Sequence, residues 1–78
     1  MRLDSKVIAI TGGSQGLGRA LAKACCREGA RVAIMGRNAD ILEAVQEEIG
    51  ERVVWFPCDI GDSTEVNNTF KEIGAQMG

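Results

Sequence analysis

The fold is decided by residues 6–18, KVIAITGGSQGLG, in which an apolar run leads directly into a glycine-rich loop. The run 6–11 is short and rich in β-branched residues, as expected of a strand buried on both faces of a sheet. The loop places four glycines immediately before a stretch with helical spacing. A strand, a glycine loop and a helix in this order can bind phosphate groups, because the helix N-terminus presents unpaired N–H groups and a partial positive charge.

Two further rounds of strand and helix follow along the chain. Residues 31–35 and 53–56 form apolar runs, and Pro57, which cannot donate to a strand ladder, ends the second run. Each run is followed by apolar residues at helical intervals. The three predicted helical stripes are Leu17, Ala20, Leu21, Ala24 and Cys25; Ile41, Leu42, Val45 and Ile49; and Val66, Phe70, Ile73 and Met77. This βαβαβα pattern with short crossovers predicts an α/β fold with a parallel sheet.

Residues at the expected ends of the helices support this division of the chain. Gly50 stands where the second helix should end, and glycine is the usual residue after a helix C-terminus. Asn38 or Asp40 is suited to cap the start of the same helix. Asp62 and Glu65 have the spacing of a capping box, which predicts the start of the third helix.

The composition is that of one small globular domain whose partner is a small molecule. Of the 78 residues, 45% are hydrophobic and 26% are charged, and the net charge is −2 without a long run of either sign. This argues against a nucleic-acid-binding arm and against a basic membrane patch. No apolar stretch approaches the roughly 18 residues of a membrane helix, and the N-terminus lacks the apolar core of a secretory signal, so we expect a cytoplasmic protein.

The cysteines give no indication of a metal site or of a disulfide framework. Cys25, Cys26 and Cys58 have neither disulfide nor zinc-ligand spacing, and the chain contains no histidine. We therefore expect no bound metal, and we expect the cysteines to be reduced and to act as small apolar residues.

The spacing of the glycine loop distinguishes between the known phosphate-binding loops. A nucleoside-triphosphate loop would end in Gly-Lys-Ser/Thr, whereas Gly18 is followed by arginine and alanine. The common dinucleotide pattern GxGxxG does not fit either, because residue 14 is serine. The pattern that fits is TGxxxGxG, formed by Thr11, Gly12, Gly16 and Gly18. The alternative is a structural turn without a ligand.

This loop pattern resembles that of the classical short-chain dehydrogenases/reductases, whose nicotinamide-cofactor loop lies between the first strand and the first helix. The resemblance covers the whole chain and implies the N-terminal half of a Rossmann fold, with three parallel strands in the order 3-2-1. It also implies that the loop contacts the phosphates and ribose of the cofactor, mainly through backbone groups. The loop residues so implied are Gly12, Ser14, Gln15, Gly16, Leu17 and Gly18.

The end of the second strand indicates which nicotinamide cofactor is bound. A carboxylate at this point would bind the ribose 2′-hydroxyl of NAD, whereas a basic residue accommodates the 2′-phosphate of NADP. Gly36 occupies the acidic position and Arg37 follows it, so we expect NADP(H) rather than NAD(H), with Asn38 as an additional contact. The alternative for Arg37 is a solvated side chain in an exposed loop.

A second landmark of the family follows the third strand. The resemblance implies that the Asp59 carboxylate accepts a hydrogen bond from the adenine amino group and that the Ile60 backbone N–H donates to the adenine ring. The alternative is that Asp59 only structures the loop before the third helix.

The catalytic residues of the family lie beyond the part that this chain resembles. The resemblance implies a later catalytic serine and a Tyr-x-x-x-Lys pair, and the 78 residues contain no tyrosine, so we assign no catalytic residue here. We expect residues 1–78 to form a single partial domain that stops before a fourth strand. The parent protein would be a homo-oligomeric oxidoreductase that reduces carbonyls or oxidises alcohols by hydride transfer. The alternative is a non-catalytic module that binds a nucleotide or self-associates through the exposed edge of its first strand.

Overall fold

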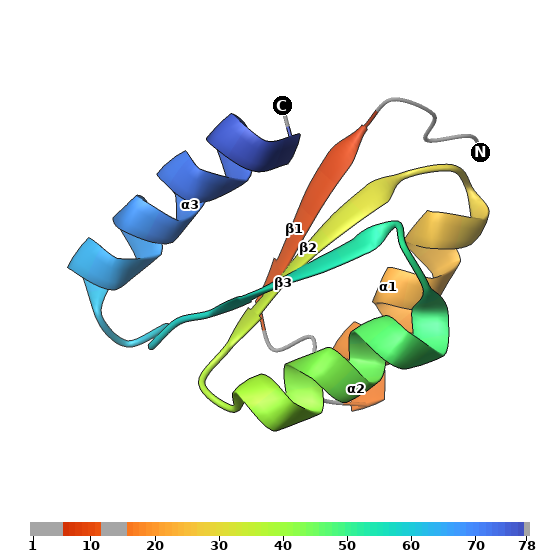
Figure 1. Ribbon diagram of the computed structural model, residues 1–78, viewed down its shortest axis with the longest axis horizontal. Helices are drawn as coiled ribbons and strands as arrows, with labels where there is room; N and C mark the ends of the chain where they lie inside the picture. The colour runs from red at the N-terminus through yellow and green to blue at the C-terminus, as the bar shows by residue number, and fades with distance from the viewer. Residues whose placement is uncertain (1–5, 12–15, 78) are drawn as a thin grey trace.

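The computed structural model describes residues 6–11 and 16–77, and strands and helices alternate throughout this part of the chain (Figure 1). The elements are β1 (Val7–Thr11), α1 (Gly16–Arg27), β2 (Arg31–Gly36), α2 (Ala39–Ile49), β3 (Val53–Pro57) and α3 (Ser63–Met77). The predicted βαβαβα order and the α/β class are confirmed. None of the helices in the described ranges is both long and apolar enough to cross a membrane.

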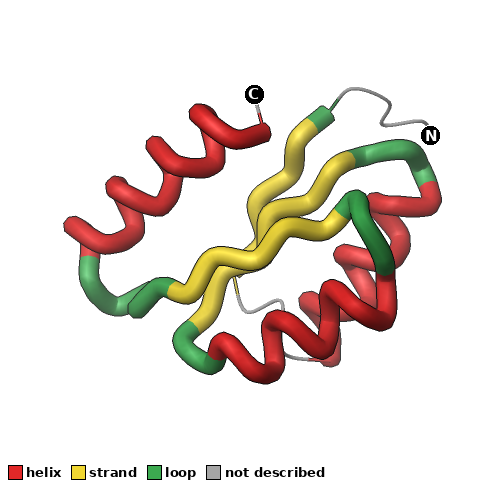
Figure 2. Tube along the Cα trace, viewed as in Figure 1, coloured by secondary structure: helices red, strands yellow, loops and turns green. Residues whose placement is uncertain are grey.

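The three strands form one parallel sheet in the order β1-β2-β3, which confirms the predicted strand order. Val7 pairs with Arg31 in β2, and Val32 of β2 pairs with Val53 in β3. Because the strands run in register, alternate residues of all three share one face of the sheet. Helices α1 and α2 cover one face and α3 lies on the other (Figures 1 and 2).

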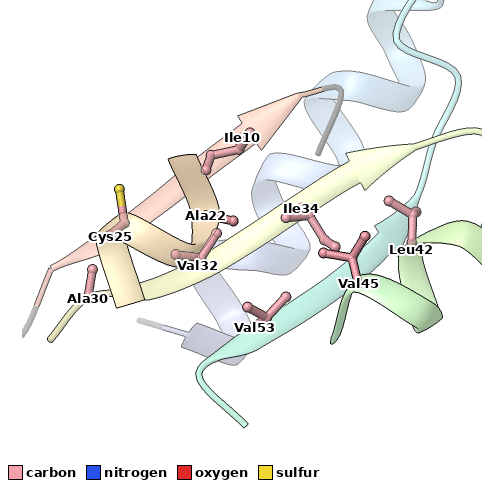
Figure 3. Close-up of a cluster of buried hydrophobic side chains, with 9 residues drawn as sticks. All are labelled: Ile10, Ala22, Cys25, Ala30, Val32, Ile34, Leu42, Val45 and Val53. Atoms are coloured by element: carbon pink, nitrogen blue, oxygen red, sulfur yellow. The ribbon is translucent and has the colours of Figure 1, made fainter. Parts of the chain in front are cut away.

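The larger core lies between the sheet and the helices α1 and α2, as the close-up in Figure 3 shows. Its members are Ile10, Ala22, Cys25, Ala30, Val32, Ile34, Leu42, Val45 and Val53. A smaller core on the opposite face is formed with α3, and its members are Ala33, Met35, Phe56, Cys58, Ile73 and Met77. The smaller core reaches Cys58, the first residue after β3, so it anchors the start of the loop that follows this strand.

The predicted apolar stripe of α1 is mostly wrong, because Cys25 is its only buried residue. Leu17 is 85% exposed and Leu21 is 50% exposed, whereas the buried residues of the helix are Ala22 and Cys25. Helical spacing fits both stripes, and the side that packs against the sheet carries the small residues Ala22 and Cys25 and no leucine. Small side chains allow the helix to approach the strands closely, which leaves the leucines on its outer surface.

The predicted stripe of α3 is partly wrong, because a polar residue takes one of the buried positions. Phe70 is 47% exposed, and Thr69 occupies the buried position beside it. The Thr69 hydroxyl donates to the carbonyl of Glu65 at 2.8 Å, so this buried polar group is satisfied within the helix. Ile41 of α2, also predicted to be apolar core, is likewise exposed.

The helix caps agree with the sequence in two cases and differ in a third. The Asn38 side chain accepts the N–H of Ile41 at 3.2 Å and caps α2, and Gly50 ends this helix with a φ of 119°. Asp62 caps α3 by accepting the N–H groups of Thr64 at 2.9 Å and Glu65 at 3.2 Å. The reciprocal bond of the predicted capping box is absent, because the Glu65 carboxylate accepts from a residue that precedes the helix.

Candidate nucleotide-binding site

The carboxyl ends of the three strands lie at the same edge of the sheet, because the strands are parallel. Ligands of open α/β sheets bind at this edge. The loops that follow β2 and β3 begin here with Arg37 and Cys58, and the glycine loop follows β1. Of the predicted loop residues, Gly12, Ser14 and Gln15 lie outside the described residues.

The described part of the glycine loop is the first turn of α1, which begins at Gly16. A Cβ atom at Gly16 would meet no heavy atom within 4 Å, so the space beside this backbone is open. The first turn of α1 contains no acidic residue. Its partial positive charge is therefore not neutralised by a carboxylate of its own first turn, which suits an anionic ligand. Leu17 is exposed and Gly18 half-buried in the same turn.

A cavity of about 310 Å³ lies between the ends of β2 and β3. It is lined by Arg37, Pro57, Cys58, Asp59 and Glu65. The structure thus brings together Arg37 and Asp59, which the sequence assigned to different parts of the same ligand. Arg37 is exposed, and within the described ranges it forms no ion pair. Its guanidinium can therefore bind a phosphate without first breaking an existing salt bridge.

Backbone hydrogen bonds fix the loop that follows β3. The N–H of Cys58 donates to the carbonyl of Gly36 at 2.7 Å, which extends the contact between β2 and β3 beyond the strands. Asp59 Oδ1 accepts the N–H of Gly61 at 3.0 Å, and the Asp59 carbonyl accepts the N–H of Asp62 at 3.0 Å. Asp59 does structure its loop, as the simpler interpretation of this residue predicts. The role at the adenine is still open to it, since within residues 6–11 and 16–77 Oδ2 has no hydrogen-bond partner.

Gly36 is the position at which an NAD-binding protein would carry a carboxylate. The residue is buried, and a Cβ atom placed on it would lie 3.5 Å from Cδ2 of Leu42, an ordinary van der Waals distance. The packing of the chain therefore does not require glycine here. Because residue 36 is glycine, β2 ends without a carboxylate next to Arg37.

The remaining predicted contacts are Asn38 and Ile60, and both are exposed at this edge. Asn38 Oδ1 already caps α2, so only its side-chain amide nitrogen is left for a ligand. Sequence analysis did not identify Glu65 as part of the site. The signal that could have found it is its position in the first turn of the helix after β3, which begins at the same edge of the sheet.

A second cavity, of about 490 Å³, lies at the opposite edge, where α1 and α2 end. Arg19 and Lys23 of α1 approach the Glu48 carboxylate of α2 at 3.0 and 3.9 Å and join the two helices beside this cavity.

Burial raises the pKa of the Cys26 thiol that lines the cavity, and the neighbouring Cys25 contributes to this rise. The thiol therefore stays protonated at neutral pH, which makes it a weak nucleophile.

The fold and the edge cavity define a class of protein, the α/β proteins that bind a nucleotide at the carboxyl ends of parallel strands. The family follows from the sequence match. The chain belongs to the short chain dehydrogenase family, whose model matches residues 6–78.

Individual relatives agree with this assignment. The chain is 38% identical over 73 residues to human 3-oxoacyl-[acyl-carrier-protein] reductase, covering 94% of the chain and 31% of that protein. It is 41% identical over 78 residues to sorbitol dehydrogenase of Cereibacter sphaeroides, covering 100% of the chain and 30% of that protein. The crystal structure of 3-ketoacyl-(acyl-carrier-protein) reductase from Brucella melitensis, complexed with NADH, superposes with a TM-score of 0.91 at 32% identity, over 97% of this chain and 31% of that one. The chain thus spans about a third of the length of these relatives.

Proposed function

We propose that this chain provides the adenosine half of the cofactor site of an NADP(H)-dependent oxidoreductase. The reaction would be the reduction of a carbonyl or the oxidation of an alcohol, in which the bound nicotinamide donates or accepts a hydride. The observation that carries the proposal is the joint position of Arg37 and Asp59 at one cavity, with Gly36 in place of a carboxylate. We assign no residue of these 78 to the chemical step.

Each group of the chain has a separate part in binding. The backbone N–H groups at the start of α1 bind the pyrophosphate, and the open space at Gly16 lets it approach. Arg37 binds the ribose 2′-phosphate through charge-assisted hydrogen bonds. Asp59 Oδ2 accepts from the adenine amino group, and the N–H of Ile60 donates to the ring. The exposed amide of Asn38 lies next to Arg37 and is a further donor for the 2′-phosphate.

The first experiment is a titration of the purified chain with NADPH and with NADH. Calorimetry gives the affinities, and energy transfer from Trp55, the single tryptophan, gives an independent signal. We expect saturable binding of both, with NADPH bound about 10-fold to 100-fold more tightly, which corresponds to one charge-assisted pair of about 1.5–3 kcal/mol. Equal affinity for both cofactors would refute NADP(H) selectivity. The comparison with NADH is needed because the structure of the Brucella relative contains NADH.

Two further properties of the proposed enzyme are its location and its assembly. We expect the enzyme in the cytoplasm, a reducing compartment in which cysteines without disulfide spacing remain thiols. The family resemblance implies a homo-oligomer, and analytical ultracentrifugation of the purified protein measures its mass.

A second candidate function is self-association of a module that is not itself an enzyme. Within the described residues β1 has a strand neighbour on one side only, and Val7 on this strand is 37% exposed. An unpaired apolar edge favours pairing with another strand. We expect sedimentation to show a mass that rises with protein concentration, and replacement of the exposed Ala9 by lysine to lower it. A monomer at all concentrations would remove this candidate.

A further inference from the structure

Glu65 has an unusual position among the residues of the edge cavity. It lies in the first turn of α3, lines the cavity, and its Oε1 accepts the backbone N–H of Asp59 at 3.3 Å. The two residues are six positions apart, so this bond connects the start of the loop with the helix that follows it.

The bond replaces the one that a capping box would form. In a capping box the Glu65 carboxylate would accept the N–H of Asp62. That N–H instead donates to the Asp59 carbonyl at 3.0 Å, so it is not available to Glu65. The N–H of Asp59 is thus bound to the first turn of α3 and its carbonyl to Asp62, the residue that caps this helix, so both backbone groups of Asp59 are held at the start of α3.

We infer that Glu65 is a positioning residue for adenine recognition: its carboxylate holds the Asp59 backbone so that Asp59 Oδ2 and the Ile60 N–H face the nucleotide. This inference rests on the proposed function, since it assumes that adenine binds at Asp59. Asp59 Oδ1 is already held by the N–H of Gly61, which fixes the rotation of the carboxylate once the backbone is placed. Glu65 therefore acts on the ligand through Asp59.

A positional role has a signature that a loss of stability does not have. The two groups held by the loop recognise adenine by its amino group and its ring nitrogen, and hypoxanthine lacks this amino group. When the loop is displaced, the preference for adenine over hypoxanthine falls. When the fold is only destabilised, binding of both nucleotides falls together and the preference is unchanged.

The experiment measures the affinities of NADPH and of its hypoxanthine analogue for the full chain and for three variants. We expect Glu65→Ala to reduce the adenine preference about threefold to tenfold, the range of one hydrogen bond. Glu65→Gln keeps an acceptor oxygen at the same place and should restore the preference to within about twofold. Glu72→Ala removes the same charge from an exposed position of α3 and serves as the matched control, with no expected change.

The outcomes separate this inference from the proposed function. If the unmodified chain binds neither nucleotide or shows no adenine preference, the proposed adenosine site is wrong, and this inference is wrong with it. If the unmodified chain prefers adenine and Glu65→Ala leaves the preference unchanged, only the role of Glu65 is refuted. A preference lost equally in the alanine and glutamine variants would also overturn it, because the charge and not the accepted bond would then matter.

Discussion

At the end of β2, two adjacent residues determine which charges a nucleotide meets. Gly36 contributes no side chain, and Arg37 contributes a guanidinium that has no ion-pair partner among the described residues. An unpaired guanidinium at the rim of a cavity binds a phosphate in bidentate geometry without the loss of an earlier pair. The selectivity between the two cofactors is thus set by single residues, and single substitutions can test it.

We expect Arg37→Asp to weaken NADPH binding by at least about tenfold and to reduce or reverse the preference over NADH. The new carboxylate repels the 2′-phosphate and can accept from the 2′-hydroxyl of NADH. Calorimetric titration with both cofactors measures the change. Arg27→Asp is the matched control, because Arg27 is exposed at the other edge of the sheet and lines the second cavity. An unchanged preference would contradict the assignment of Arg37.

Gly36→Asp should shift the selectivity toward NADH by supplying the missing carboxylate. The chain has room for the Cβ atom, which would lie 3.5 Å from Cδ2 of Leu42. We expect the NADPH to NADH affinity ratio to fall about tenfold or more, as measured by competition between the two cofactors. Gly36→Ala introduces the same Cβ without the charge and should leave the ratio unchanged. If alanine shifts it equally, the cause is steric.

Gly16→Val tests whether the glycine loop binds phosphate. The side chain would enter open space, so circular dichroism should show little change in secondary structure. It would also occupy the place where the pyrophosphate approaches the backbone, so neither cofactor should bind. Gly74→Val adds the same side chain to α3, likewise into open space, and should leave cofactor binding intact. Retained binding in the Gly16 variant would indicate a structural turn.

At the scale of the elements, the sequence predicted where each strand and helix lies better than it predicted which side each helix buries. Alternating apolar runs and the cap at Asn38 were enough to place the elements. The orientation of α1 could not be predicted, because its apolar residues form two overlapping stripes and only contact with the sheet distinguishes them. In α3 the apolar pattern did not predict that Thr69 is buried, because threonine is polar. Burial is possible here because the Thr69 hydroxyl forms its hydrogen bond within the helix.

The buried side of α1 can be tested by stability measurements. Ala22 has no exposed surface and lies between the helix and the sheet, so Ala22→Leu should lower the free energy of unfolding by about 1–3 kcal/mol through overpacking. Leu21→Gln, on the outer side of the same helix, should change it by less, roughly 0.5 kcal/mol. Urea unfolding followed by circular dichroism measures both. A larger loss for the Leu21 variant would mean that the packing of α1 is reversed.

The candidate site shows a similar limit of prediction at the same scale. Arg37 and Asp59 could be expected at one edge, because the carboxyl ends of neighbouring parallel strands lie together. The position of Glu65 at this edge could have been expected from its place in the first turn of the helix after β3. Its bond to Asp59 could not, since the bond depends on the path of residues 58–62 between β3 and α3. The sequence has the spacing of a capping box, but the Glu65 carboxylate accepts the N–H of Asp59 instead of that of Asp62.

At the scale of the whole molecule, the two faces of the sheet are covered unequally. Two helices pack against one face, while α3 alone covers the part of the other face formed by β2 and β3 (Figure 1). On that second face Val7, Ala9 and Thr11 of β1 are exposed. At its C-terminal end α3 is joined to the sheet by a long-range bond, in which the Arg31 guanidinium donates to the Met77 carbonyl at 3.1 Å.

A helix that packs alone on its face can detach while the rest of the domain stays folded. Detachment of α3 would remove Glu65 from Asp59, open the cavity and break up the smaller core, whereas α1, α2 and the larger core would be unaffected. Amide hydrogens of α3 should therefore exchange with solvent faster than those of β2, and NADPH should slow the exchange of α3 in particular. Hydrogen exchange followed by mass spectrometry would show this, and uniform protection of all helices would exclude it. The cofactor would then be a part of what holds the third helix in place.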